Sequence, residues 1–341
     1  MSPLQDDEEY QGRTRDRAKK RERTRSRVKT GKSLPDNALQ AVVIQSVGPA
    51  WIVQVAGGEP LAPSYVVATV SGTVDREEAD TIVTVGDLVW VAGDTIIKVE
   101  PRTTVLSRKA AGRQQKEQVL VANVDQLAIV MSAREPTYNK RLIDRYLIAA
   151  DKGDLSPLII INKMDLLAED EAAEVRDDFY TYWHDLKTPV FFVTVSPSGL
   201  VGDTSSLLAA LHDKRTLLAG PSGVGKSSII NTLSNAGQEV GEISTMFLKG
   251  KHTTTSARLI PLEGGGELVD SPGIREFAIW ELDLDELPYY FEEFEPFMHT
   301  CKYTPCTHTH EPDCAVKDAL EEGKIDPERY LSYLMLREQL T

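Results

Sequence analysis

Residues 220–227 read Gly-Pro-Ser-Gly-Val-Gly-Lys-Ser, and this segment constrains the fold more than any other part of the chain. It satisfies the pattern G-x-x-x-x-G-K-[ST], follows the apolar run 216–219 and precedes a segment that we expect to be helical from Lys226. In that context the glycines let successive backbone N–H groups surround a phosphate, and the helix N-terminus adds its positive end. Lys226 would reach the terminal phosphates, and the Ser227 hydroxyl would bind Mg²⁺. The predicted phosphate-binding residues are Gly220, Pro221, Ser222, Gly223, Val224, Gly225, Lys226, Ser227 and Ser228.

Apolar and amphipathic segments alternate from about residue 118 up to this loop. The predicted strands are 118–122, 126–132, 158–161, 190–195 and 216–219, and the predicted helices are 140–151, 169–187 and 204–212. Strands that alternate with helices are typical of a parallel α/β sheet covered on both faces. We therefore expect the phosphate-binding loop at the carboxyl ends of such strands.

The segment Asn162-Lys163-Met164-Asp165 matches N-K-x-D and follows one of the predicted strands. A carboxylate such as Asp165 can accept hydrogen bonds from N1–H and the 2-amino group of guanine, a pair that adenine does not offer. Asn162 would tie strand ends together, and the stem of Lys163 would lie over the base. The pattern alone also fits solvated surface residues, but beside a phosphate-binding loop it indicates a guanine nucleotide. Ser196 begins the segment Ser196-Pro-Ser-Gly199, which we expect to supply a backbone contact to the guanine oxygen.

Two further segments follow the phosphate-binding loop. Asp270-Ser-Pro-Gly273 matches D-x-x-G, in which Asp270 would hold Mg²⁺ through water and the Gly273 N–H would sense the γ-phosphate. The polar stretch Gly250-Lys-His-Thr-Thr-Thr255 lies between the loop and this motif. One of its three threonines would complete the Mg²⁺ shell when the γ-phosphate is present.

The order of these motifs along the chain is unusual. Ordinary GTPases run from the phosphate-binding loop through the threonine switch and D-x-x-G to N-K-x-D and the serine loop. Here N-K-x-D and the serine loop come first, which is a circular permutation of the same ring of elements. The permutation is physically tolerable because the site lies at the carboxyl ends of parallel strands, whatever the order of connection.

With this order, the segments Gly250-Lys-His-Thr-Thr-Thr255, Asp270-Ser-Pro-Gly-Ile-Arg-Glu-Phe277 and Ala122-Asn-Val-Asp125 resemble the RsgA (YjeQ) family. These are circularly permuted GTPases that act in maturation of the small ribosomal subunit. The resemblance extends from about Leu39 to Leu340. It implies an N-terminal OB-fold, a central GTPase domain and a C-terminal zinc domain. The chain departs from the family pattern at Pro197, where Ala is usual, and in the long basic arm before Leu34.

The position that holds the water-orienting Gln in Ras-like enzymes is occupied here by Ile274, which cannot take that role. His252 is the nearest candidate catalytic residue, because a neutral imidazole can accept a proton from water. The family resemblance points to the same histidine, and by the same matching it favours Thr254 as the Mg²⁺ ligand over Thr253 and Thr255. An alternative is that His252 contacts only solvent or rRNA.

All three cysteines of the chain lie within fourteen residues and form, with one histidine, a Cys-x₄-Cys-x-His-x₅-Cys pattern. Three thiolates and one imidazole are a typical structural zinc set with no open position for catalysis. His310 and His299 are alternative fourth ligands, and the resemblance favours His308. The predicted ligands of a single zinc ion are Cys301, Cys306, His308 and Cys314.

Five short alternating runs between residues 41 and 99 are separated by Gly, Pro and acidic clusters. They predict a small β-barrel, with an OB-fold as the first choice and an SH3-like barrel as an alternative that periodicity cannot separate from it. Before it, residues 1–32 hold eleven Lys/Arg and six Asp/Glu, a net charge of +5. Since the whole chain carries −14, the remaining residues carry −19. A basic segment without apolar periodicity indicates an arm for nucleic-acid phosphates, or else a solubilising tail.

Composition excludes several classes of protein. No apolar run approaches the roughly 20 residues of a membrane span, and the acidic start is not a secretory signal. Three clustered cysteines fit a reducing compartment better than a disulfide scaffold. We therefore expect a cytoplasmic protein without a membrane partner, and a monomer.

These observations predict an α/β circularly permuted P-loop GTPase domain at 106–286, with an all-β OB-fold barrel at 38–105. A disordered basic arm occupies 1–37, and a small helical zinc-binding domain occupies 287–341. The expected function is GTP hydrolysis to GDP by a late-stage assembly factor bound to the small (30S) ribosomal subunit and its rRNA. A GTP-dependent switch that recruits a protein through the zinc domain is an alternative, favoured by Ile274. An ATP-using P-loop enzyme is disfavoured by the N-K-x-D segment.

Overall fold

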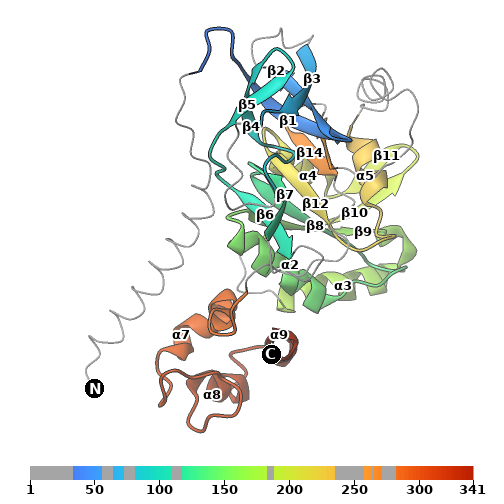
Figure 1. Ribbon diagram of the computed structural model, residues 1–341. Coiled ribbons are helices and arrows are strands. Elements are labelled where there is room, and N and C mark those ends of the chain that lie inside the picture. The colour runs from blue at the N-terminus through green and yellow to red at the C-terminus, as the bar shows by residue number, and fades with distance from the viewer. Residues whose placement is uncertain are drawn as a thin grey trace.

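The structure, a computed structural model, describes residues 34–55, 64–72, 81–109, 117–182, 188–234, 257–262, 264–270 and 282–340. Predictions for the basic arm and for His252, Thr254, Gly273 and Ile274 lie outside the described residues. Figure 1 shows the barrel at one end of the molecule, the α/β sheet in the middle and the C-terminal helices at the other end.

The first five strands close into a barrel. They are β1 (Leu39–Val47), β2 (Ala50–Val55), β3 (Ser64–Val70), β4 (Leu88–Ala92) and β5 (Thr95–Val99). The strand order is β1-β2-β3-β5-β4, and β4 pairs back onto β1, so the sheet has no free edge here. Only the β3–β5 pair is parallel. The interior is filled by small and β-branched side chains such as Val43, Val53 and Ile96, which are fully buried. The predicted barrel of five short strands is confirmed, and it is OB-like.

The central domain is a mostly parallel sheet in the order β11-β10-β9-β8-β12-β14-β13. Strands β10, β9, β8, β12 and β14 run parallel, while β11 and β13 are antiparallel at the two sides. The bounds are β8 (Gln126–Ser132), β9 (Ser156–Asn162), β10 (Val190–Ser196), β11 (Gly199–Gly202), β12 (Arg215–Ala219), β13 (Arg258–Pro261) and β14 (Glu267–Asp270). Strand β12, which leads into the phosphate-binding loop, therefore lies between β8 and β14. The predicted parallel α/β sheet is confirmed.

Helices cover both faces of this sheet. They are α2 (Lys140–Lys152), α3 (Glu169–Tyr182), α4 (Thr204–Leu211) and α5 (Lys226–Leu233), with a short 3₁₀ turn η1 (Met164–Leu166) after β9. Every residue of β8 is buried, and its side chains alternate between the two layers. Leu127 and Ile129 belong to the core beneath α2 and α3, whereas Ala128 and Val130 belong to the core beneath α4 and α5. The five residues between Gln126 and Ser132 are all apolar, as burial on both faces requires.

The barrel and the α/β domain share backbone pairing, because Gln45 of β1 pairs with Arg258 of β13. Between the two domains, β6 (Val105–Lys109) and β7 (Glu117–Ala122) form a separate two-stranded sheet. Strand β7 was predicted from the sequence, whereas β6, the short strand β11 and β13 were not. The predicted helix 169–187 is described as far as Tyr182, and residues 183–187 lie outside the described part.

The C-terminal part is built from short helices around an aromatic core. Its elements are η3 (Leu287–Tyr290), η4 (Glu292–Phe294), α7 (Glu295–Met298), α8 (Ala315–Glu321) and α9 (Pro327–Leu340). The rings of Phe291, Phe294 and Tyr333 have centroids 5.1–5.4 Å apart and are buried. The predicted helical character of this C-terminal part is confirmed. No helix among the described residues has the length and apolar character needed to cross a membrane.

Candidate nucleotide and metal sites

The predicted phosphate-binding loop connects β12 to α5 through three glycines with positive φ. Gly220 (φ 143°) passes so close to β8 that a Cβ atom there would lie 2.1 Å from the Val130 carbonyl oxygen. Gly225 (φ 98°) is equally confined, since a Cβ would lie 2.2 Å from Nδ2 of Asn162. Only glycine satisfies both the backbone conformation and the space at these positions. The loop is thus fixed against β8 on one side and β9 on the other.

The ammonium group of Lys226 lies inside this loop. Its Nζ donates hydrogen bonds to the backbone carbonyls of Gly220 and Pro221, both at 2.7 Å. Ser227 and Ser228, in the first turn of α5, are exposed. The loop therefore collects a cation, exposed hydroxyls and a helix N-terminus around one point, which is an arrangement suited to phosphate.

Asn162 joins the N-K-x-D segment to the phosphate-binding loop. It lies at the end of β9 and is 2% exposed, and its Nδ2 donates a 2.9 Å hydrogen bond to the Val224 carbonyl. Lys163 has a left-handed backbone (φ 61°), and its Nζ donates to the Glu135 carbonyl in the connection between β8 and α2. The two segments are 62 residues apart in the chain and directly bonded in the fold.

Asp165 and Ser196 lie at the carboxyl ends of neighbouring strands. The backbone N–H of Asp165 donates to the Thr194 hydroxyl at 3.1 Å, which fastens η1 to β10, and the carboxylate is exposed. The Ser196 hydroxyl donates to the Gly199 carbonyl at 2.9 Å and accepts from the Ser198 N–H at 3.3 Å. The serine therefore shapes the turn between β10 and β11. Pro197 has no N–H, and the Ser198 N–H is already bonded to the Ser196 hydroxyl.

Asp270 ends β14, directly beside β12, where it pairs in register with Leu218. One of its carboxylate oxygens lies 3.9 Å from Nη2 of Arg258. The carboxylate is therefore at the same edge of the sheet as the phosphate-binding loop, as predicted.

The Cys/His cluster is assembled in the C-terminal domain. One potential ligand atom from each of its four residues lies within 4.8 Å of the others. The Sγ atoms of Cys301 and Cys314 are 3.8 Å apart, and Nδ1 of His308 is 3.5 Å and 3.4 Å from them. Two sulfurs that each lie about 2.3 Å from a zinc ion at the tetrahedral angle are separated by roughly 3.8 Å, and a sulfur and a nitrogen by roughly 3.5 Å. The donor set Cys301, Cys306, His308 and Cys314 therefore fits a tetrahedral zinc ion.

Burial shifts the pKa values of the side chains in this cluster. Burial raises the pKa of the Cys306 thiol to about 12 and also raises that of Cys301, and the neighbouring cysteines add to both shifts. Burial lowers the pKa of His308 to about 4, so its imidazole is neutral and able to ligate. A divalent cation is what would favour the thiolate forms at neutral pH. His308 and Cys314 are 3% and 1% exposed, whereas Cys301 and Cys306 are partly exposed.

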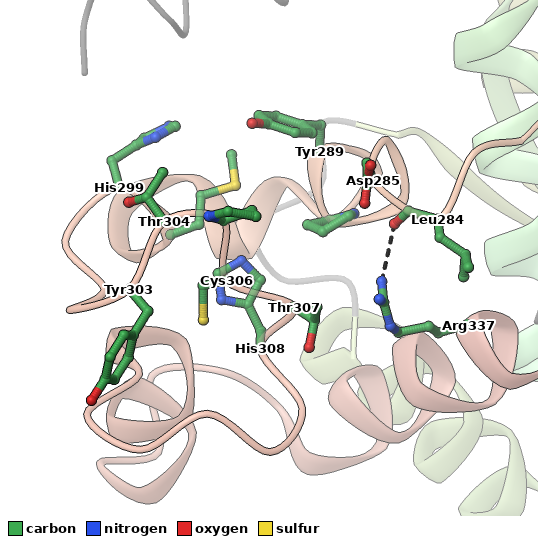
Figure 2. Close-up of a pocket in the computed structure, with 13 residues that line it drawn as sticks. Leu284, Asp285, Tyr289, His299, Tyr303, Thr304, Cys306, Thr307, His308 and Arg337 are labelled. Carbon is green, nitrogen blue, oxygen red and sulfur yellow. Dashed lines mark hydrogen bonds between the residues drawn. The ribbon is translucent and has the colours of Figure 1, made fainter. Parts of the chain in front are cut away.

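A cavity of about 120 Å³ adjoins the cluster (Figure 2), and Cys306 and His308 form part of its wall. Tyr289, Tyr303 and Arg337 line other sides, and Arg337 donates a 3.1 Å hydrogen bond to the Leu284 carbonyl. The cavity is bounded by the metal-binding loop, η3 and α9, so a metal ion would support its wall directly.

The sequence pattern of the RsgA GTPase family matches residues 99–280, more than half of the chain. The chain belongs to the RsgA GTPase family. Proteins named small ribosomal subunit biogenesis GTPase RsgA from Chlorobaculum parvum and Gemmatimonas aurantiaca are 38% and 35% identical to it. These matches cover 89% and 88% of this chain, and 99% and 96% of the two relatives.

Solved structures agree with this membership of the RsgA family. YjeQ from Thermotoga maritima superimposes with a TM-score of 0.70 at 29% identity, covering 89% of this chain and 98% of its own. YloQ, described as a circularly permuted GTPase, has a TM-score of 0.66 at 24% identity and shares the fold. The predicted permuted GTPase fold and the predicted family are both confirmed.

In this RsgA-family chain the fold brings together the phosphate-binding loop, Asn162, Lys163 and Asp270 at one edge of the sheet. His252, Thr254 and Gly273 lie outside the described residues, and their roles stay predictions. Sequence reasoning missed the Glu135 carbonyl and the Thr194 hydroxyl, which hold Lys163 and Asp165 in place. No motif contains either residue, because a backbone carbonyl and a lone threonine carry no sequence signal.

Proposed function

We propose that the chain is a GTP-hydrolysing assembly factor of the small ribosomal subunit. The observation that supports this most strongly is the Asn162–Val224 hydrogen bond, which joins the guanine-type segment to the phosphate-binding loop in the permuted order of the RsgA family. Two relatives that the chain matches over almost their whole length are named small ribosomal subunit biogenesis GTPase. The guanine-type segment, the phosphate-binding loop and the names of the relatives therefore all support the same function.

In this proposal GTP lies along the carboxyl edge of the sheet. Residues 220–228 surround the phosphates, with Lys226 exchanging its two carbonyl partners for phosphate oxygens. Asp165 accepts from guanine N1–H and its 2-amino group, the Lys163 stem covers the base, and the loop at Ser196 meets the guanine oxygen. Asn162 holds the two halves of the site together.

A magnesium ion fits the residues at the phosphate end of the site. The Ser227 hydroxyl is exposed in the first turn of α5, and the Asp270 carboxylate ends the neighbouring strand, so both oxygen donors are of the kind that Mg²⁺ prefers. We propose that Thr254 completes the set and that Gly273 senses the γ-phosphate. The ion would neutralise charge on the phosphates during transfer to water.

We propose His252 as the residue that orients or deprotonates the attacking water, because Ile274 replaces the usual glutamine. Hydrolysis is then slow in the free protein and faster on the small subunit, at a late stage of its assembly. One zinc ion per chain, held by the Cys₃His set, stabilises the C-terminal domain as a structural element.

We propose that rRNA is the docking partner within the subunit. The OB-like barrel offers a face of the kind that binds single-stranded RNA, and the arm before residue 33 adds positive charge to an otherwise acidic chain. The boundaries near residues 37, 105 and 286 would then separate arm, barrel, GTPase and zinc domains. A monomer in the cytoplasm, where ribosomal subunits are assembled, is the working form, with no membrane partner.

Base specificity and subunit binding test the proposal separately. Competition against a fluorescent N-methylanthraniloyl (mant) GDP should show GTP and GDP displacing it at concentrations at least 100-fold below those of ATP. Asp165→Asn should weaken the binding of GDP and strengthen the binding of xanthosine diphosphate (XDP), because an amide N–H can donate to the 2-oxo group of xanthine. Cosedimentation with purified small subunits should be stronger with a non-hydrolysable GTP analogue than with GDP. Equal displacement by ATP would overturn the proposed guanine specificity. Absence of cosedimentation with both the GTP analogue and GDP would overturn the proposed subunit binding.

A further inference from the structure

Arg329 of α9 lies buried between the C-terminal domain and helix α2 of the GTPase domain. It is 4% exposed, and its Nη1 donates a 2.5 Å hydrogen bond to Asp144, which is 1% exposed. Its Nε and Nη2 donate to the two carboxylate oxygens of Glu293 at 2.5 and 3.0 Å. Asp144 also accepts from the Tyr182 hydroxyl of α3 at 2.8 Å. One guanidinium thus holds carboxylates from two domains that are far apart in the sequence.

A second, more exposed contact lies one turn earlier on α2 and one residue earlier on α9. Lys140 at the start of α2 donates to Glu328 of α9 at 2.7 Å and to Asp178 of α3 at 2.5 Å. Next to Asp144 in the middle of α2, Arg145 donates to Gln339, near the end of α9, at 3.2 Å. In Figure 1 the C-terminal helices lie against α2 and α3, at the end of the molecule away from the barrel. The first half of α2 is therefore bonded to α9 at three positions, Lys140, Asp144 and Arg145.

Helix α2 also contacts the phosphate-binding loop directly. Tyr146 lies two residues after Asp144 and is 1% exposed. Its hydroxyl forms a hydrogen bond with the backbone of Gly220. Burial raises the pKa of Tyr146 to about 12, and this hydrogen bond opposes the rise, as expected when the Gly220 N–H is the donor. The first glycine of the loop is thus bonded to the helix that carries Asp144.

The connection that leads from β8 into α2 is fastened to the guanine-type segment. The Glu135 carbonyl accepts the hydrogen bond from Lys163, and the Ala133 N–H donates to the Asn162 carbonyl at 2.9 Å. The Ser132 hydroxyl donates to the Pro136 carbonyl at 2.6 Å. Glu135 is held with φ at 56°, a conformation that a non-glycine residue adopts only where its surroundings impose it. A shift of α2 along its axis would disturb both this connection and the Tyr146–Gly220 contact.

We propose that Arg329, assisted by Lys140, is a positioning residue for nucleotide binding, acting through α2 on Gly220 and Lys163. A buried ion pair is no more stabilising than well-packed apolar side chains, so its energetic value alone does not explain a guanidinium here. Its directional bonds fix where α2 lies. This inference rests on the proposed nucleotide site. It implies that a partner pulling on α9 changes the rate at which nucleotide leaves.

The test measures the rate of mant-GDP release by stopped-flow fluorescence in the zinc-loaded full chain. Lys140→Met should raise that rate roughly three- to ten-fold, the range expected for loss of one charge-assisted hydrogen bond in a positioning contact. Arg329→Lys should raise it further. Because Arg329 is buried and its variants can unfold, Lys140→Met carries the test. Lys324→Met is the matched control, since Lys324 is exposed and pairs with Glu322 inside the C-terminal domain.

A double-variant cycle separates positioning from simple loss of stability. Lys163→Met keeps the stem over the base and removes only the ammonium that binds the Glu135 carbonyl. If α2 acts partly through that bond, the Lys140→Met/Lys163→Met protein should release nucleotide less rapidly than the product of the two single effects predicts. Multiplicative effects, or a wild-type rate in Lys140→Met, would overturn the inference. Wild-type protein that does not bind mant-GDP would instead refute the proposed nucleotide site.

Discussion

The side-chain amide of Asn162 donates a 2.9 Å hydrogen bond to the backbone carbonyl of Val224. This bond crosses from the end of β9 to the phosphate-binding loop, which follows β12, and it spans the two segments whose order is exchanged in a permuted GTPase. The order of connection does not matter to it, because both residues lie at the carboxyl edge of one parallel sheet. The relationship explains how a reordered chain builds the same site.

Asn162→Ala should weaken GDP binding about ten-fold, because the buried Val224 carbonyl loses its donor at a cost of about 1–3 kcal/mol. Asn162→Asp should weaken it at least as much, since a carboxylate keeps the shape but offers no N–H. Titration calorimetry gives both affinities. An unchanged affinity in the alanine variant would contradict the role assigned to this bond.

Gly225→Ala should abolish tight nucleotide binding. The added Cβ would lie 2.2 Å from the Asn162 amide, in a backbone with φ at 98°. Gly264→Ala is the matched control, because that residue also has positive φ (89°) but its Cβ would meet nothing within 4 Å. Both variants carry a backbone strain of about 1 kcal/mol, so the control separates the effect of the strain from that of the contact with Asn162. Only Gly225→Ala should lose mant-GDP binding, and equal losses would contradict the account.

Tyr146→Phe should accelerate mant-GDP release several-fold while leaving the ring packing of α2 intact. The change removes only the hydroxyl that is bonded to the Gly220 backbone, so one buried polar group of the loop is left without its partner. Tyr180→Phe, at an exposed position on α3, serves as the control and should release nucleotide at the wild-type rate. Identical rates in the two variants would show that the hydroxyl has no part in the site.

Cys314→Ser should reduce bound zinc from about one ion per chain to well below that value and unfold the C-terminal domain. The serine oxygen is a much poorer zinc ligand than a thiolate, and a small domain depends on its metal for stability. His310→Ala should keep its zinc, because the cluster uses His308. Elemental analysis of freshly purified, reduced protein measures the content. Zinc-free wild-type protein, or zinc loss in His310→Ala, would contradict the assignment.

Sequence patterns predicted the elements that carry motifs or strong periodicity. The Gly220–Ser227 loop between a strand and a helix, the buried strand β8 and the Cys/His cluster were all expected, because each depends on residue type at fixed local spacing. The contacts that fix the site were not. The bonds from Lys163 to the Glu135 carbonyl and from Arg329 to Asp144 join distant positions through tertiary packing, which no local pattern encodes. The short strands β6, β11 and β13 were missed for the same reason, since pairing partners define them.

GTP hydrolysis measured with and without purified small ribosomal subunits shows whether the chain is a GTPase that acts on the subunit, with ATP and large subunits as controls. The account predicts slow hydrolysis by the protein alone and a marked stimulation that requires GTP and small subunits together. A basal rate that small subunits leave unchanged would contradict it. That result would instead favour a GTP-dependent switch with little hydrolysis, which agrees with the isoleucine at position 274.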